Sequence, residues 1–403
     1  MRVDLRFNLA VGALTSPHFN VRVMMPLLLG ATGAARGFAD GELGELGAAY
    51  SAGATLVALS SVLWLRSAVR FPLLLFQLLG LGALAAMAGG VSFGAALAAY
   101  FAAGIGCGGA YALVIALISR SDDPDRAVGW QWCLGTIPGV VLLLVAAPVA
   151  ARGAGLGATV ALLALANLAV LVALPFAPAR LPDAPGGSVA GRAGRVPAAA
   201  LVALFAVFAF YVAATGAWSF LGRIATDAAL PAAYAGAVFS AAAAVSALVG
   251  LVVAELGVAG ERPALMAGAV ILMLAGFALV AGWPTRLGFA VGVVVSISLT
   301  TYALSYAIAM VPRLDVGARA SGLPAAALGL GSIAGPATAG QLYQHFGTVA
   351  TLGGSAATLV AGFLAYAWVQ PRARHAPPDP AGPEREPLGS AAGTTPAPDP
   401  TGP

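Results

Sequence analysis

The sequence predicts an all-α membrane protein whose twelve transmembrane helices form two pseudo-symmetric six-helix bundles. Apolar residues make up 60% of the 403 residues and charged residues only 9%, with a mean hydropathy of +0.91. A soluble domain, by contrast, carries about 25% charged residues. Apolar runs of about 20 residues, the length that a helix needs to cross a bilayer, recur along the chain. One polar segment near the middle separates two apolar halves that share matching strings.

The polar segment contains four prolines, three arginines and several glycines between Pro178 and Pro197. This composition is typical of a solvated linker. We therefore predict a first bundle over residues 1–177, a cytoplasmic linker over 178–196 and a second bundle over 197–371. Residues 372–403 are rich in proline and too polar to form a core, so they are predicted to be a disordered tail.

The apolar runs predict six helices on each side of the linker. The first six cover residues 8–30, 43–65, 71–91, 95–118, 128–150 and 154–177. The last six cover residues 197–221, 232–256, 264–283, 286–311, 321–344 and 348–370. Short polar connections separate the runs, so neighbouring helices are expected to cross the membrane in opposite directions.

The arginines predict the orientation, since cytoplasmic loops carry an excess of basic residues. With the N-terminus inside, fifteen arginines fall on the cytoplasmic side and four on the other, and Arg22 lies within the first helix. Both termini are therefore expected in the cytoplasm. The chain contains no lysine and is rich in alanine and glycine, which suggests a GC-rich bacterial genome and hence a bacterial cytoplasmic (inner) membrane.

Two pairs of matching strings indicate an internal repeat. Residues 47–52 read GAAYSA and residues 236–241 read GAVFSA, in the second and eighth predicted helices. Residues 122–129 read DDPDRAVG and residues 315–322 read DVGARASG, in the loops after the fourth and tenth. Repeats of several membrane spans are typical of secondary transporters.

These features resemble the major facilitator superfamily over about residues 7–370. The resemblance includes the two D-x-x-x-R-A-x-G loops and the span-five string GTIPG at residues 135–139, with Gly335-Pro336 as its counterpart. It implies that spans one, four, seven and ten line a central cavity. The substrate-binding candidates on the last three of these spans are Tyr111, Tyr211, Trp218, Ser298, Tyr302 and Tyr306. Gln131, near the inner end of span five, is a further candidate; each could equally be packing between helices.

His18 and Arg22 are the strongest binding candidates, because they share one face of the first helix and lie within its apolar stretch. No deeply placed Asp or Glu is available to pair with Arg22. Either an anionic substrate supplies that charge, or the guanidinium reaches outward or caps backbone carbonyls near Pro26. His18 could exchange a coupling proton, having a reference pKa near 6.5, or it could be a neutral histidine hydrogen-bonded to another helix.

Six residues are expected to gate or shape the protein. Asp122 and Arg126, and likewise Asp315 and Arg319, are expected to form cytoplasmic charge latches that break and re-form as the halves rock. The alternative is that these charges are solvated turns that only mark the topology. Pro138 and Pro336 are expected to shape the fifth and eleventh helices.

The sequence therefore favours a secondary transporter, working by alternating access, for a small organic solute that is anionic or amphipathic, with efflux somewhat favoured over uptake. A membrane sensor without flux is the first alternative. An enzyme is not expected: the GxGxxG string at 104–109 lies inside a predicted membrane helix, without the strand–turn–helix context of a dinucleotide site. Neither a metal, a cofactor nor a nucleic acid is predicted. The expected partners are the solute, the lipid bilayer and, in one alternative, a coupling proton, and the expected state is a monomer.

Overall fold

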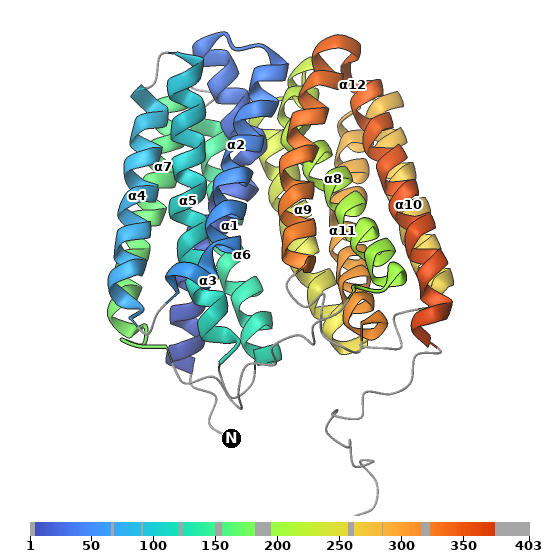
Figure 1. Ribbon diagram of the computed structural model, residues 1–403. Coiled ribbons are helices and arrows are strands. Elements are labelled where there is room, and N and C mark those ends of the chain that lie inside the picture. Colours follow the sequence, from blue (N-terminus) through green and yellow to red (C-terminus); the bar gives the residue numbers. More distant parts are fainter. Residues whose placement is uncertain are drawn as a thin grey trace, which may run out of the picture.

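The computed structural model describes residues 5–65, 68–89, 92–120, 124–149, 155–181, 195–256, 262–283, 285–315 and 323–374. Within them lie the helices α1 (Leu5–Arg36), α2 (Asp40–Leu59), α3 (Ser61–Trp64), α4 (Arg70–Gly89), α5 (Phe93–Ile118), α6 (Pro124–Val149), α7 (Gly155–Ala169), η2 (Val170–Phe176), α8 (Ala198–Asp227), α9 (Ala232–Leu256), α10 (Pro263–Gly282), α11 (Arg286–Leu314) and α12 (Leu323–Arg374). They form two groups that stand side by side, one before residue 181 and one after residue 195 (Figure 1). We call these the first and second helix groups.

The long α12 contains two of the predicted membrane helices. Gly347 interrupts it with φ 73° and ψ −165°, outside the helical region. Such a positive φ is easy for glycine, which has no Cβ, and allows the chain to turn back sharply. Residues 323–346 and 348–374 therefore run as a hairpin (Figure 1), as the predicted boundary between the eleventh and twelfth helices requires.

Lipid, and not water, explains which side chains face outward. Large apolar side chains are exposed on the helix surfaces; among them Val172 is 75% exposed, Leu287 73% and Phe346 72%. Eight of the described helices are long and apolar enough to cross a membrane, counting α12 once. The remaining predicted spans are α1, α2 and α6, and residues Leu134–Val149 of α6 form a shorter apolar helix. The chain is a multi-pass membrane protein.

The two repeated strings occupy equivalent crossings between the groups. A Cβ on Gly47 of α2 would lie 3.0 Å from Cβ of Pro336 in α12, and one on Gly236 of α9 would lie 2.8 Å from the carbonyl oxygen of Leu143 in α6. Span two therefore crosses span eleven as span eight crosses span five. The two crossings are thus equivalent under the pseudo-symmetry that interchanges the two helix groups. The predicted fold class of twelve helices in two pseudo-symmetric bundles is confirmed.

The helices begin and end at two opposite ends of the molecule (Figure 1). The Asp40 end holds the α1–α2 turn and the end of α8, and the Arg70 end holds the starts of α1, α4 and α8 (Figure 1). At the Arg70 end, Ala68 pairs with Arg180 in an antiparallel bridge, and the Val69 N–H donates to the Ala179 carbonyl at 3.0 Å. Most of the predicted linker, residues 182–194, and the predicted tail from residue 375 lie outside the described residues.

Candidate functional site

His18, near the middle of α1, lies in an aromatic cage. Its Nδ1 is 3.1 Å from the hydroxyl of Tyr50 on α2. Its ring stacks on Tyr111 of α5, with 4.8 Å between ring centroids and 28° between planes, and lies 6.0 Å from the Tyr50 ring. The His18 side chain is buried. Three helices of the first group thus hold this imidazole in place, which is the geometry of the packing alternative for His18.

Arg22 lies one turn further along α1, where the two helix groups meet. Its position is roughly 20–25 Å from either end of the helix at 1.5 Å per residue. The guanidinium carbon lies 5.1 Å from the ring centroid of Tyr211 on α8, and the Trp218 indole N–H, also on α8, donates to the Arg22 carbonyl at 3.0 Å. Both partners come from the second group, so Arg22 joins the two groups.

No carboxylate among the described residues forms an ion pair with Arg22. A cation–π contact contributes about 0.5–2 kcal/mol, whereas withdrawing an ion from water costs several kcal/mol. Arg22 is only partly buried, so it bears part of this cost, and the Tyr211 ring offsets some of it.

Gln131 on α6 adds an unused hydrogen-bonding group to the site. Its side chain is fully buried, and neither its amide nitrogen nor its amide oxygen has a hydrogen-bond partner among the described residues. The Tyr111 hydroxyl faces this amide without completing a bond of normal geometry. One turn along α6, Gly135 approaches Phe19 of α1, so this face of α6 looks toward the His18 helix.

The structure brings together six of the nine predicted binding residues, which are His18, Arg22, Tyr111, Gln131, Tyr211 and Trp218. Ser298 points elsewhere, since its hydroxyl donates to the Ala242 carbonyl of α9 at 3.3 Å and fastens α11 within the second group. Tyr302 and Tyr306 pack edge to face on one another with 4.8 Å between centroids, in the buried core.

Tyr50 is the site residue that the sequence reasoning missed. A tyrosine on an Ala/Gly-rich helix carries no motif of its own. The internal repeat did contain a signal, because Tyr50 belongs to the string at 47–52 and corresponds to Phe239 in the string at 236–241. Phe239 lies 5.6 Å from the Trp218 ring, so both members of the pair pack against candidate site residues.

The predicted cytoplasmic latches remain predictions. Asp122, Arg319 and the side chain of Arg126 lie outside the described residues, and Asp315 is buried where α11 ends. Pro138 lies inside α6. Pro336 lies at the crossing of α2 and α12, against Gly44 and Gly47.

A set of polar contacts closes the opposite end, where none was predicted. Arg223 of α8 forms an ion pair with Asp40 at the start of α2, with 2.8 Å between Nε and Oδ1. The Gly41 N–H donates to Oε1 of Gln344 on α12 at 2.8 Å. Within the second group, the Tyr343 hydroxyl donates to the Asp227 carboxylate. The first two contacts join the helix groups at the Asp40 end.

Replacing Asp40 by Asn should loosen this end. An ion pair this exposed contributes about 0.2–1 kcal/mol, so the open population should rise by no more than about fivefold. Spin labels on cysteines introduced at Ala35 of α1 and Ala232 of α9 would report the distance between the two helix groups at this end, in a chain with Cys107 and Cys133 replaced by Ala. Glu42→Gln is the matched control, because the bond that the structure describes for the Glu42 carboxylate comes from the Ala39 N–H of its own helix start. Equal distances between the two spin labels in the Asp40 and Glu42 variants would show that the ion pair does not stabilise the contact between the helix groups at this end.

Solved structures resemble this chain, although neither a family model nor a curated protein sequence matches it. The human organic anion transporter MFSD10 (TETRAN) superposes with a TM-score of 0.54 at 17% identity, covering 90% of this chain and 98% of that one. A bacterial homologue of the human lysosomal transporter Spinster, in an inward-facing and unoccupied conformation, gives 0.62 at 16% identity over 92% and 96%. The nucleoside transporter NupG gives 0.66 at 15% identity over 91% and 99%.

At these identities the similarity shows the fold and no more. Each match spans nearly the whole of both chains, so the shared feature is the complete two-bundle architecture and not a single helix pair. The chain has the fold of major facilitator superfamily transporters, as the resemblance in the sequence implied.

Proposed function

We propose that this protein is a secondary transporter that carries a small organic anion across the bacterial inner membrane by alternating access. The single observation that carries the proposal is Arg22, a guanidinium in the middle of a membrane helix, at the meeting of the two groups, without a carboxylate partner among the described residues. That one of the similar structures is an organic anion transporter agrees with this substrate class.

The aromatic surroundings of Arg22 favour an amphipathic anion. Tyr50, Tyr111 and Tyr211 approach the His18–Arg22 face from three different helices. Aromatic rings with a polar tip suit a solute that has both an apolar body and a charged group. The Gln131 side chain offers two amide N–H donors and one carbonyl acceptor to such a solute. The proposed roles are therefore charge pairing by Arg22, stacking by the tyrosines and orientation by Gln131.

The arrangement of the helix groups supports an inward-facing state. At the Asp40 end the ion pair and the α6–α9 crossing join the groups, whereas the α2–α12 contact runs from Gly44 and Gly340 at this end to Thr55 and Gly329 further along α2. On α6, the contacts to α9 lie at Val140, Leu143 and Ala147, whereas Gly135 and Gly139, nearer the Arg70 end, face α1. With the N-terminus in the cytoplasm, as the arginine distribution predicts, the Asp40 end faces outside and is the closed one.

Proteoliposomes would test the proposal. Purified protein reconstituted at known orientation should catalyse exchange of a labelled aromatic carboxylate such as salicylate, and should not carry the neutral amide salicylamide. Flux measured from each side tests the expected direction, export, and an imposed pH gradient tests proton coupling. Absence of saturable flux for a panel of aromatic, aliphatic and phosphorylated anions would contradict the proposal.

Gln131→Leu should separate binding from folding. Removing a buried amide that has no hydrogen-bond partner among the described residues should leave stability unchanged or raise it, because an unsatisfied buried polar group costs about 1–3 kcal/mol. Transport should nevertheless fall by roughly tenfold, because the variant loses about one hydrogen bond to the solute and such a bond contributes about that factor in affinity. Thermal unfolding and anion exchange are measured on the same preparation. A variant that loses stability and flux together would identify Gln131 as structural.

A further inference from the structure

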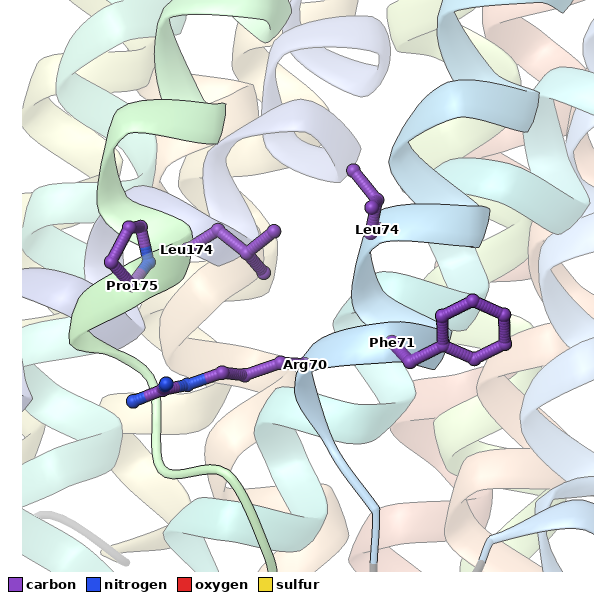
Figure 2. Close-up of a pocket in the computed structure, with 5 residues that line it drawn as sticks. All are labelled: Arg70, Phe71, Leu74, Leu174 and Pro175. Atoms are coloured by element: carbon purple, nitrogen blue, oxygen red, sulfur yellow. The ribbon is translucent and has the colours of Figure 1, made fainter.

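We propose that a groove on the outer surface of the first helix group binds an anionic phospholipid from the leaflet at the Arg70 end. The groove lies between α4 and η2, is about 390 Å³ in volume and is lined by Arg70, Phe71, Leu74, Leu174 and Pro175. Figure 2 shows Phe71 and Leu74 on one side, Leu174 and Pro175 on the other, and the Arg70 side chain reaching across the end of the groove. This site is separate from the Arg22 site and does not depend on the proposed transport function.

The apolar part of the groove suits an acyl chain. Phe71 is 67% exposed and Phe176, next to the lining residue Pro175, is 63% exposed. Proline lacks an N–H and cannot continue the α-helical hydrogen-bond ladder, and the last seven residues of this span form the 3₁₀ helix η2 with Pro175 inside it. The groove lies beside this irregular end of the span, where the bilayer is the surrounding solvent.

The charged end of the groove suits a phosphate. Arg70 is exposed and is anchored by one hydrogen bond from its Nε to the Ala177 carbonyl at 2.8 Å, and its terminal amino groups make no hydrogen bond that the structure describes. The bridge between Ala68 and Arg180 places a second, exposed arginine at the same edge. Neither Arg70 nor Arg180 forms an ion pair with a carboxylate of the described residues. The positive end of the α4 dipole adds to the same field.

These features together select a lipid with net negative charge. Arginine binds phosphate oxygens in a fork geometry that lysine lacks, and basic pockets between membrane helices bind the headgroups of anionic lipids. A zwitterionic headgroup offers the same phosphate but also carries a cation that the two arginines repel. The occupant is therefore a phospholipid such as phosphatidylglycerol. This lipid would lie where the chain after the sixth span pairs with the loop that follows the second span.

Native mass spectrometry of the full-length protein tests this site. Wild-type protein should bind phosphatidylglycerol about fivefold or more tightly than phosphatidylcholine with the same acyl chains. Arg70→Gln should abolish this preference, and Leu74→Trp, which fills the groove and leaves the charge intact, should remove binding of both lipids here. Arg286→Gln is the control, because it deletes an arginine that lies over the Tyr234 ring in the other helix group.

Three outcomes would overturn the proposal. Phosphatidylglycerol preference that survives Arg70→Gln would place the anionic site elsewhere, and unchanged lipid binding in Leu74→Trp would exclude the groove. A dimer that Leu74→Trp dissociates would show a second copy of the chain as the occupant. Should Arg70→Gln fail to fold, Arg180→Gln and Leu74→Trp decide the question, since Arg180 makes no side-chain hydrogen bond that the structure describes.

Discussion

Replacing Arg22 by Gln is expected to abolish saturable anion transport. The solute's negative charge would lose the guanidinium that pairs with it in the proposed site, and truncating one member of a desolvated charged pair costs about 2–5 kcal/mol. Affinity for an anionic solute should therefore fall by roughly 30-fold to more than 1,000-fold. Binding of salicylate to purified protein, measured by calorimetry beside the flux assay, checks this result.

Two further variants give the Arg22 experiment its controls. Arg22→Lys keeps the charge but loses the planar fork, so it should recover part of the affinity and not all of it. Tyr211→Phe keeps the ring under the guanidinium at 5.1 Å and removes only the hydroxyl, so charge pairing should survive. If Arg22→Gln binds salicylate as tightly as the unaltered protein, the guanidinium serves packing and the proposed substrate class is wrong.

Replacing Gly44 by Leu should hold the Asp40 end open. A Cβ on Gly44 would lie 2.5 Å from the Pro336 carbonyl and 2.9 Å from Cα of Gly340, so the backbones of α2 and α12 leave no room for a side chain. Small residues permit such close helix approach in membranes. Overpacking costs about 1–3 kcal/mol, more than the Asp40–Arg223 ion pair contributes. The open population should therefore increase by about 5- to 150-fold.

The same spin labels at Ala35 and Ala232 report this opening. Gly30→Leu is the matched control, because a Cβ on Gly30 of α1 would meet no atom within 4 Å. Transport should be lost in the Gly44 variant and retained in the Gly30 variant, since each turnover requires the Asp40 end to close. Gly44→Ala should give the same change in a milder form. Unchanged label distances in Gly44→Leu would show that this crossing does not control the opening.

Twelve membrane spans could be read from the sequence because hydrophobic length is a local property of each segment. The arginine excess on one side and the strings at 47–52 and 236–241 added topology and internal symmetry by equally local reasoning. The last boundary came from the apolar runs 321–344 and 348–370 alone, and the structure places the turn at Gly347 between them.

Side-chain direction was harder to predict, and the candidate site shows why. Ser298 was a candidate because the resemblance places its helix beside the cavity, yet its hydroxyl reaches the Ala242 carbonyl of α9. The resemblance places a helix beside the cavity but does not fix how that helix is rotated. Tyr50 was missed for the same reason, because only the packing of α1 against α2 and α5 brings its hydroxyl to His18.

The sequence by itself determined that this chain spans the membrane twelve times in two matching halves, and that Arg22 is a charge placed inside an apolar helix. These results follow from transfer free energies along the chain, which need no knowledge of the neighbours. Only the tertiary structure decided that Tyr211 and Trp218 of the second group contact Arg22, that Gln131 is buried without a hydrogen-bond partner among the described residues, and that Asp40 and Arg223 join the groups at one end. Such contacts join residues far apart in the chain, and they depend on helix rotation and close backbone approach.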